Sequence, residues 1–531
     1  MIHDFQDYDT DARIECDICI AGAGAAGIAM ARHLIGSSLK VVLLEGGGLD
    51  YEDDSQAIYQ GRNVGHLYFD LDVTRLRYFG GTTNHWAGEC APLDPSDLEP
   101  KAWVSHSGWP ITWADLDPWY GLAQDVIGLG DYDYDHISAS PKGTPFLDFA
   151  DDKIAHKVWR FSEPVNYFGE TFRGELDRAP NVEVWLHANL VDIETEANGS
   201  HVTGFKIMTF GGKAVSVSAQ HFILALGGLE NPRMLLNSVS VNPAGLGNDR
   251  DLVGRFFADH LNGIAGEIAV SRSGWEQAYE YVQFDDIRGL TKIRVSPKAQ
   301  SARSLLNSAA HLGKKPTARN TSPGYKALRK IRNDLKHGHF PEKLGQRIKD
   351  VATDLDGIWD GLVEYFVDTS VYIEVEAEQA PNPDSRVTLV EEQDALGLRR
   401  MQLDWRLSAM DRESIRGLVQ LVGEEAGRLG IGRAMVADWL MDSGDTWPDH
   451  QLGGNHHIGT TRMADDPSKG VVDANCRVFG IDNLFIAGSS VFPTSGSANP
   501  TLTIVALALR LASHIEKSST PENQSASRVP Q

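Results

Sequence analysis

Apolar runs that end in glycine turns occur near both ends of the chain and in its middle. The run "CDICIAG" at 16–22 predicts a buried strand and a tight turn, followed by a helix from about Ala25. "KVVLLEGG" at 40–47 predicts a second buried strand. "HFILALGG" at 221–228 and "NLFIAG" at 483–488 repeat the strand and its turn far along the chain. If these runs join one sheet, the chain leaves that sheet and later returns to it.

The remaining patterns predict helices and a second kind of strand. A short helix should follow Pro232, and the apolar run from Pro500 should form the last helix, because a proline in the first turn has no N–H to lose. Apolar and polar residues alternate in "VYIEVEAEQ", "SRVTLV" and "RRMQLDWRL", between 371 and 407. This alternation predicts antiparallel strands that form the floor of one sheet, covered on one side by a helix at about 410–428.

These patterns predict an α/β protein with two domains, because 531 residues exceed one ordinary core. We expect a Rossmann-like nucleotide-binding domain to be assembled from three discontinuous segments: 1–95, 175–262 and 445–520. We expect a substrate domain, with an antiparallel sheet and helices, to comprise 96–174 and 263–444, including a basic helical insertion at about 300–365. The polar tail, 521–531, is expected to be disordered.

The first glycine turn carries the spacing of a dinucleotide-binding motif. Gly22, Gly24 and Gly27 form GxGxxG, which permits a tight turn, close approach of a pyrophosphate and close packing of the helix on the strand. The free N–H groups of the helix then point at the phosphates. Glu45 ends the second strand, where a carboxylate can accept both hydroxyls of an adenosine ribose. At this point the motif leaves FAD and NAD open.

Composition limits the kinds of partner the protein can bind and indicates its cellular compartment. The chain carries 49 Lys and Arg against 73 Asp and Glu, a net charge of −24, which excludes nucleic acid as the main partner. Its four cysteines suggest no disulfide framework and fit a reducing compartment, and Cys16 and Cys19 are interpreted as small side chains of a buried strand. The N-terminus has no signal sequence, and no run reaches the roughly 20 apolar residues of a membrane span. We therefore expect a cytoplasmic protein.

One segment departs from the acidic average. Between Lys314 and Lys349 there are eleven Lys or Arg against two acids, a net charge of +9 with helical spacing. We expect a solvated helical insertion. The alternatives are a lid over the substrate site, a contact between the subunits of a homo-oligomer, or a dock for an acidic electron-acceptor protein.

Six motifs together resemble the glucose-methanol-choline (GMC) oxidoreductases. Besides GxGxxG with Glu45, they are "FGGTTNHWAG" at 79–88, "ALGGLENPRMLL" at 225–236, "EQAPNPDSRVTL" at 378–389, "HHIGTTRM" at 456–463 and "NLFIAGSSVFPTSGSANPTLT" at 483–503. The resemblance is nearest to the sugar-oxidising branch, which includes pyranose-oxidase-like and glycoside- and fructose-dehydrogenase-like proteins. It implies FAD, and oxidation of a CH–OH group to a carbonyl.

The resemblance also implies roles for particular residues. His456, three residues before Gly459, corresponds to the base that takes the hydroxyl proton, and a near-neutral imidazole suits that role. Asn499 corresponds to the second polar residue, which donates a hydrogen bond to the developing alkoxide. His457 is then expected to pack beside the site. The helix after Asn499 would place its positive N-terminal end against the flavin ring.

The remaining expectations concern cofactor contacts. His85 lies where some members of the family bond the flavin covalently, and this link is kept as an alternative to noncovalent binding. We expect no metal. The predicted FAD-binding residues are Gly22, Gly24, Ala26, Gly27, Glu45, Gly80, Gly81, Thr82, Asn84, His85, Trp86, Val191, Ala225, Gly227, Gly488, Asn499, Pro500 and Thr501.

The expected function is oxidation of a sugar or glycoside hydroxyl, with hydride transfer to flavin N5. The alternatives are an oxidase of a non-sugar natural-product intermediate and a catalytically idle flavoprotein that serves as a partner. Oxygen, a quinone or a redox protein could take the electrons. A group of aromatic residues could wall a sugar site, although packing in the core is the more common role of such side chains: Trp103, Trp109, Trp113, Trp119 and Tyr120.

Overall fold

The first predicted strand lies in the interior of a six-stranded parallel sheet, and its glycine turn follows directly at the end of that strand. The computed structural model describes residues 1–8, 14–135, 143–284, 287–314, 322–336, 343–359, 370–441, 447–448 and 452–519. The sheet has the strand order β1 (Ile2–Asp4), β8 (Val182–Leu186), β4 (Val41–Leu44), β3 (Ile18–Ala21), β12 (His221–Leu224) and β21 (Leu484–Ile486). Its central strands are apolar at every position because both faces are covered. The mixed α/β class is thereby confirmed.

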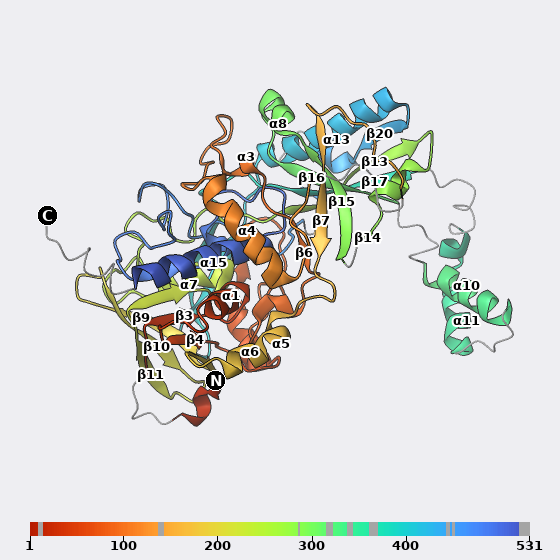
Figure 1. The fold of residues 1–531 in the computed structure, drawn as a ribbon. Coiled ribbons are helices and arrows are strands. Elements are labelled where there is room, and N and C mark those ends of the chain that lie inside the picture. Colours follow the sequence, from red (N-terminus) through yellow and green to blue (C-terminus); the bar gives the residue numbers. More distant parts are fainter. Residues whose placement is uncertain are drawn as a thin grey trace.

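Helices from opposite ends of the chain cover this sheet together. Figure 1 shows α1 (Ala25–His33) beside α15 (Thr501–Ser518), with α4 (Trp113–Ile127) against α15. A four-stranded sheet completes this half of the molecule: β2 (Ile14–Glu15), β11 (Ala214–Ser218), β10 (Val202–Met208) and β9 (Asn189–Thr195). The return of the chain to the first sheet brings the last helix to the glycine turn.

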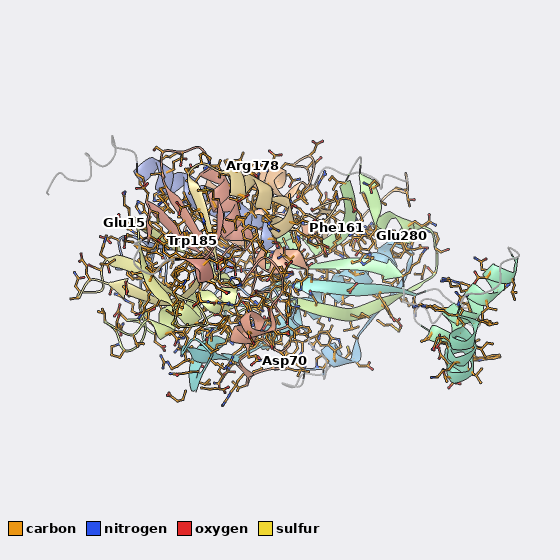
Figure 2. The ribbon with its side chains drawn as sticks, turned by 90° about the horizontal axis from the view of Figure 1, so that it is seen from below. Glu15, Asp70, Phe161, Arg178, Trp185 and Glu280 are labelled. Atoms are coloured by element: carbon orange, nitrogen blue, oxygen red, sulfur yellow. The ribbon has the colours of Figure 1, made fainter. Side chains whose placement is uncertain are left out.

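A separate eight-stranded sheet forms the other half. Its order is β20 (Gly432–Val436), β13 (Leu261–Val270), β17 (Ser370–Ala377), β16 (Ser308–Lys314), β15 (Ile287–Val295), β7 (Ile154–Phe161) and β6 (Glu89–Cys90), with β14 (Val282–Phe284) paired to β15. The predicted covering helix is present as α13 (Ala409–Leu429) and packs on this sheet. In Figure 2, Trp185 of β8 and Phe161 of β7 mark the two halves, and side chains fill the space between them.

Two expectations about local structure were wrong. Only β17 of the three predicted floor strands belongs to the large sheet. The other two, β18 (Arg386–Gln393) and β19 (Arg399–Asp404), form a small sheet with β5 (Arg62–Asn63).

The helix predicted after Pro232 is α7 (Gly227–Asn237), which contains that proline. Pro232 has no N–H to donate to the Gly228 carbonyl. That carbonyl accepts a hydrogen bond from the Thr460 hydroxyl at 2.5 Å instead, so the helix can begin before the proline.

The remaining helices are short except for two. Those near the sheets are η1 (Phe5–Asp7), α2 (Asp53–Gln56), η2 (Ala57–Tyr59), η3 (Gly81–Asn84), α3 (Pro95–Leu98), α5 (Phe168–Thr171), α6 (Arg173–Arg178), η4 (Trp275–Tyr279), α8 (Pro297–Arg303), α14 (Asp438–Met441) and η5 (Ser489–Val491). The helices α10 (Pro323–Lys336) and α11 (Leu344–Thr353) carry the basic segment and project away from both sheets (Figure 1). None of the helices in the described part of the chain has both the length and the hydropathy to cross a membrane. The tail, 521–531, lies outside the described residues, and the domain limits stay a prediction.

Candidate active site

A cavity of about 470 Å³ joins the glycine turn to the C-terminal motifs. Predicted residues from six separate segments line it: Gly22, Gly24, Ala26, Glu45, Gly81, Thr82, His85, Trp86, Ala225, Gly227, His456, Gly488, Asn499, Pro500 and Thr501. The parallel strands β3, β12 and β21 all end at this cavity, which is why segments far apart in the sequence meet here. The arrangement brings the predicted base and the predicted dinucleotide motif to one space.

Four predicted residues do not line the cavity. Gly27 lies against the turn, since an added Cβ would be 1.9 Å from the Gly22 carbonyl oxygen, so it serves helix packing. Gly80 and Asn84 shape the loop beneath: the Gly80 N–H donates to the Ala23 carbonyl (2.8 Å), and the Asn84 amide donates to the Phe79 carbonyl (2.9 Å). Val191 does not line the cavity either. Neighbouring residues of a strand face opposite sides, and it is Leu190 that reaches the cavity.

The glycine turn has the shape that a pyrophosphate needs. Gly22 has a φ of +106°, and its added Cβ would lie 2.4 Å from the Ala225 carbonyl oxygen, so only glycine fits. At Gly24 an added Cβ would meet nothing within 4 Å, which leaves open space at the N-terminus of α1. A phosphate placed there would meet the free N–H groups of the helix.

Glu45 is held ready at the end of β4. Its carboxylate is buried and accepts hydrogen bonds from the N–H groups of Ala23 (3.1 Å) and Gly47 (2.9 Å). Burial raises the pKa of Glu45, while these N–H groups and Arg77 oppose the shift. Each carboxylate oxygen accepts more than one hydrogen bond, so ribose hydroxyls can still bind. The turn, Glu45 and the helix end together fit a dinucleotide cofactor.

His456 lies in a loop that is fixed by a buried aspartate. Asp259 accepts the backbone N–H groups of Asn455 (3.0 Å) and His456 (2.8 Å), and the Tyr68 hydroxyl at 2.5 Å. The preceding glycines are required, since a Cβ on Gly453 would lie 2.6 Å from the Tyr68 ring, and one on Gly454 would lie 3.1 Å from Nδ1 of His456. The loop can therefore pack closely on both side chains.

His260 sets which nitrogen of His456 carries the proton. His260 is fully buried, and its Nε2 lies 2.9 Å from the Gly496 carbonyl, which can only accept. Its Nε2 is therefore protonated, and its Nδ1 is an acceptor in the neutral ring. The Nδ1 of His456 lies 2.8 Å away and must donate. This leaves Nε2 of His456 as the unprotonated nitrogen, the one that a base must present.

Charged groups lie behind the two histidines. An Oε1 of the buried Glu376 is 3.9 Å from Nδ1 of His456, and its other oxygen accepts from Lys292 at 2.7 Å. Lys292 also lies 2.8 Å from Glu89, so one ammonium serves two carboxylates. Burial, together with the neighbouring His260, lowers the pKa of His456 to about 3, and Glu376 opposes the shift. The imidazole is therefore neutral at physiological pH.

Asn499 presents a donor to the cavity. The indole N–H of Trp159 donates to its carbonyl oxygen at 3.0 Å, and an indole nitrogen can only donate. The carboxamide orientation is therefore fixed, with its NH₂ group as the end that remains for a ligand. Pro500 and Thr501 follow at the N-terminus of α15, which gives this part of the cavity a positive partial charge.

Three further polar side chains lie at the cavity. Arg75 lines it, with its guanidinium 4.1 Å over the Tyr59 ring and its Nη2 donating to Glu230 at 3.0 Å. His85 lines it as well, and burial lowers its pKa. His457 packs between Tyr68 and Phe257, beside the predicted base. Of the five aromatic residues proposed as a sugar wall, none lines this cavity.

The donor atoms of His260, Glu376 and His456 lie within 4.8 Å of one another, close enough to bind a metal ion. These donor atoms already have partners. The Nδ1 atoms of the two histidines share one proton, and the carboxylate of Glu376 accepts a hydrogen bond from the ammonium of Lys292. The chemistry of the cluster is therefore that of a proton-binding network.

Sequence reasoning missed His260, Glu376, Lys292, Trp159 and Arg75. Glu374 and Glu376 alternate with apolar residues on β17, the pattern of a strand with one solvated face. Glu376 is nevertheless buried, because its end of the strand lies against His260 and His456. His260 could have been noticed as part of the Asp-His pair directly before β13. Backbone hydrogen bonds pair this segment with the loop that carries His456.

Comparisons with known proteins agree with this geometry. A family model described as GMC oxidoreductase matches residues 381–508. The chain is 24% identical to the fructose dehydrogenase large subunit of Gluconobacter japonicus, over 94% of this chain and 98% of that protein. It is also 24% identical to the 2-methyl-1,2-propanediol dehydrogenase of Mycolicibacterium austroafricanum, over 98% and 100%. The crystal structure of pyridoxine 4-oxidase from Mesorbium loti has the same fold, with a TM-score of 0.53, 17% identity and coverage of 94% and 99%.

Proposed function

The chain belongs to the GMC oxidoreductase family, and on this basis we propose that it oxidises a CH–OH group of a sugar or glycoside to a carbonyl. One observation carries the proposal: His456 and Asn499 line the same cavity as Gly22 and Gly24. A base and a hydrogen-bond donor for the substrate oxygen therefore lie where the cofactor binds.

The cofactor is FAD, which accepts a hydride from the substrate carbon when bound. We propose that the turn at Gly22 and Gly24 binds its pyrophosphate, that Glu45 binds its ribose, and that Arg75 and the N-terminus of α15 contact its flavin part. We propose noncovalent binding. Precipitation of the protein with acid should release FAD into the supernatant, and FAD retained in the pellet would instead indicate a bond through His85.

His456 acts as the base in this proposal. Its Nε2 is the nitrogen without a proton, since Gly496 fixes the tautomer of His260 and His260 fixes that of His456. It takes the proton of the substrate hydroxyl, and the imidazolium that forms lies 3.9 Å from the carboxylate of Glu376. Asn499, oriented by Trp159, donates a hydrogen bond to the substrate oxygen as its negative charge develops.

The substrate class rests on the sugar-oxidising branch that the motifs resemble and on the similarity to a fructose dehydrogenase. Equal identity to a propanediol dehydrogenase favours a non-sugar alcohol as the second candidate. We propose oxygen, a quinone or a redox protein as the electron acceptor. The four free cysteines support the cytoplasm as the compartment.

The decisive experiment is anaerobic reduction of the bound flavin by a panel of monosaccharides, glycosides and simple diols, followed by absorbance. We expect a sugar or glycoside to bleach the flavin of the parent protein. The His456→Ala variant should retain FAD but reduce it at least a hundredfold more slowly. Reduction at the parent rate would refute the role of His456, and bleaching by diols alone would refute the sugar assignment.

A further inference from the structure

The two projecting helices form a hairpin, which we call the basic arm (residues 322–336 and 343–359). The carboxylate of Asp354 accepts the Gly324 N–H (2.9 Å) at one end, and Arg347 pairs with Asp334 at 2.5 Å between α10 and α11. These contacts hold the two helices to each other. The basic arm is therefore a preformed element rather than two independent helices.

Both helices carry an apolar stripe. In α10 the stripe is Leu328, Ile331 and Leu335, and in α11 it is Leu344, Ile348 and Val351, continued by Leu355. Spacings of three, four and seven residues place each set on one side of its helix. In a helix that packs on a protein core, such a stripe is buried.

Here the stripes are only partly covered, because Ile331, Leu344 and Val351 are half-buried while the other members are exposed. The exposed fractions are 61% for Leu335, 54% for Ile348, 65% for Leu355 and 68% for Trp359. In Figure 2 the side chains of the arm spread outward, at a distance from the sticks of the two sheets. Four large apolar side chains exposed on one projecting element favour a surface that binds a partner.

Charge identifies the kind of partner. The segment from Lys314 to Lys349 carries +9, so the rest of the chain, with a total of −24, carries −33. Lys326, Arg329, Lys330 and Arg332 are exposed on α10 beside its apolar stripe. A partner for this arm must therefore offer negative charge and an apolar interior within a few ångströms of each other.

We propose that the basic arm binds the surface of an anionic phospholipid bilayer, with the stripes and Trp359 in the boundary between head groups and acyl chains. Amphipathic helices with basic polar faces and Leu or Trp on the other face bind membranes in this way. The acidic remainder of the protein does not prevent it, because the arm projects away from both sheets (Figure 1). Charges separated by more than about 8 Å are screened at physiological salt.

A second copy of the chain is the competing partner, because the acidic remainder complements the charge of the arm. Lipid is favoured because the acidic surface supplies charge alone, whereas the bilayer supplies both charge and an apolar phase for four exposed side chains. The two partners can be distinguished by experiment, because self-association needs no lipid.

The test is co-sedimentation of the full-length FAD-loaded protein with vesicles of phosphatidylcholine alone or with 40% phosphatidylglycerol, at about 50 and 500 mM salt. We expect binding only to the anionic vesicles and only at low salt. Each basic residue contributes about a fivefold factor, so Arg329→Gln with Lys330→Gln should weaken binding at least tenfold. Leu355→Ser with Trp359→Ser should weaken it to a similar extent.

Matched controls are available on the rest of the protein. Arg62→Gln with Lys469→Gln removes two exposed basic residues, and Met435→Ser removes an exposed apolar one, all outside the arm. These variants should bind as the parent does. The proposal is overturned if the parent does not bind anionic vesicles, or if the controls lose as much affinity as the arm variants. A dimer in sedimentation velocity without lipid, lost in the arm variants that bind vesicles normally, would assign the arm to self-association instead.

Discussion

Replacing His260 tests the tautomer argument directly. His260→Phe keeps a ring of similar size but removes the acceptor that faces Nδ1 of His456 at 2.8 Å. The Nδ1–H then has no acceptor in that direction, or the ring adopts the other tautomer and presents a protonated Nε2 to the substrate. Leaving a buried donor without a partner costs about 1–3 kcal/mol. At about 1.36 kcal/mol for each factor of ten, flavin reduction should slow by roughly 5- to 150-fold.

A second substitution separates tautomer control from proton transport. In His260→Gln the amide oxygen can accept from His456 while the amide nitrogen donates to Gly496, so both hydrogen bonds of the native ring are reproduced. A glutamine cannot carry a proton onward. If His260 acts by fixing the tautomer, this variant should recover most of the rate.

The assay is single-turnover flavin reduction in a stopped-flow instrument without oxygen, at saturating substrate. FAD content and thermal stability of each variant verify folding. His457→Phe is the matched control, because the Nε2 of His457 makes no hydrogen bond to any described residue, and its rate should stay within tenfold of the parent. The reasoning is refuted if His260→Phe reduces at the parent rate, or if His260→Gln is as slow as His260→Phe while both retain FAD.

Three further predictions concern charge and packing. The pKa of His456 is lowered to about 3, so its base form is present above that pH, and flavin reduction should stay constant from pH 5 to 9; an acid limb centred near 6.5 would contradict this. Glu376→Gln removes a carboxylate 3.9 Å from Nδ1 of His456, worth at most about 4 kcal/mol, so reduction at pH 7 should slow between tenfold and a thousandfold. Glu374→Gln, on the same strand but exposed, should not slow it. Gly27→Ala should abolish the flavin absorbance, because its Cβ would lie 1.9 Å from the Gly22 oxygen, whereas Gly121→Ala meets nothing within 4 Å and should keep it.

The sequence predicts those parts of the fold that rest on local patterns. The glycine turn, α1, α13 and α15 are found where apolar spacing and the end signals predict them. The place of β18 and β19 could not be predicted, because β19 pairs with β5, about 340 residues earlier, and alternation alone does not choose a sheet. Leu190 lines the cavity and Val191 does not, because the face of β9 that carries Leu190 points inward. Which face points inward is set by the neighbouring sheet.

The sequence predicts residues of the site only where a recognisable motif contains them. His456 and Asn499 lie in recognisable loops, but their orientation depends on His260, Trp159 and Gly496, which approach from other segments. A buried carboxylate such as Glu376 is invisible locally, because its burial is permitted by Lys292, a residue of another strand. The roles of all these residues stay predictions until variants are measured.

The charge network gives a reason why a weakly basic imidazole can serve as the base. Burial lowers the pKa of the His456 imidazole and so keeps it neutral, which makes proton uptake unfavourable in the resting site. Glu89, Lys292 and Glu376 together carry one excess negative charge, and this charge interacts favourably with His456 only once the ring is protonated. Its stabilisation is therefore absent from the ground state and grows as the proton is transferred. An interaction that strengthens on the way to the transition state accelerates the reaction, whereas one present from the start would only tighten binding.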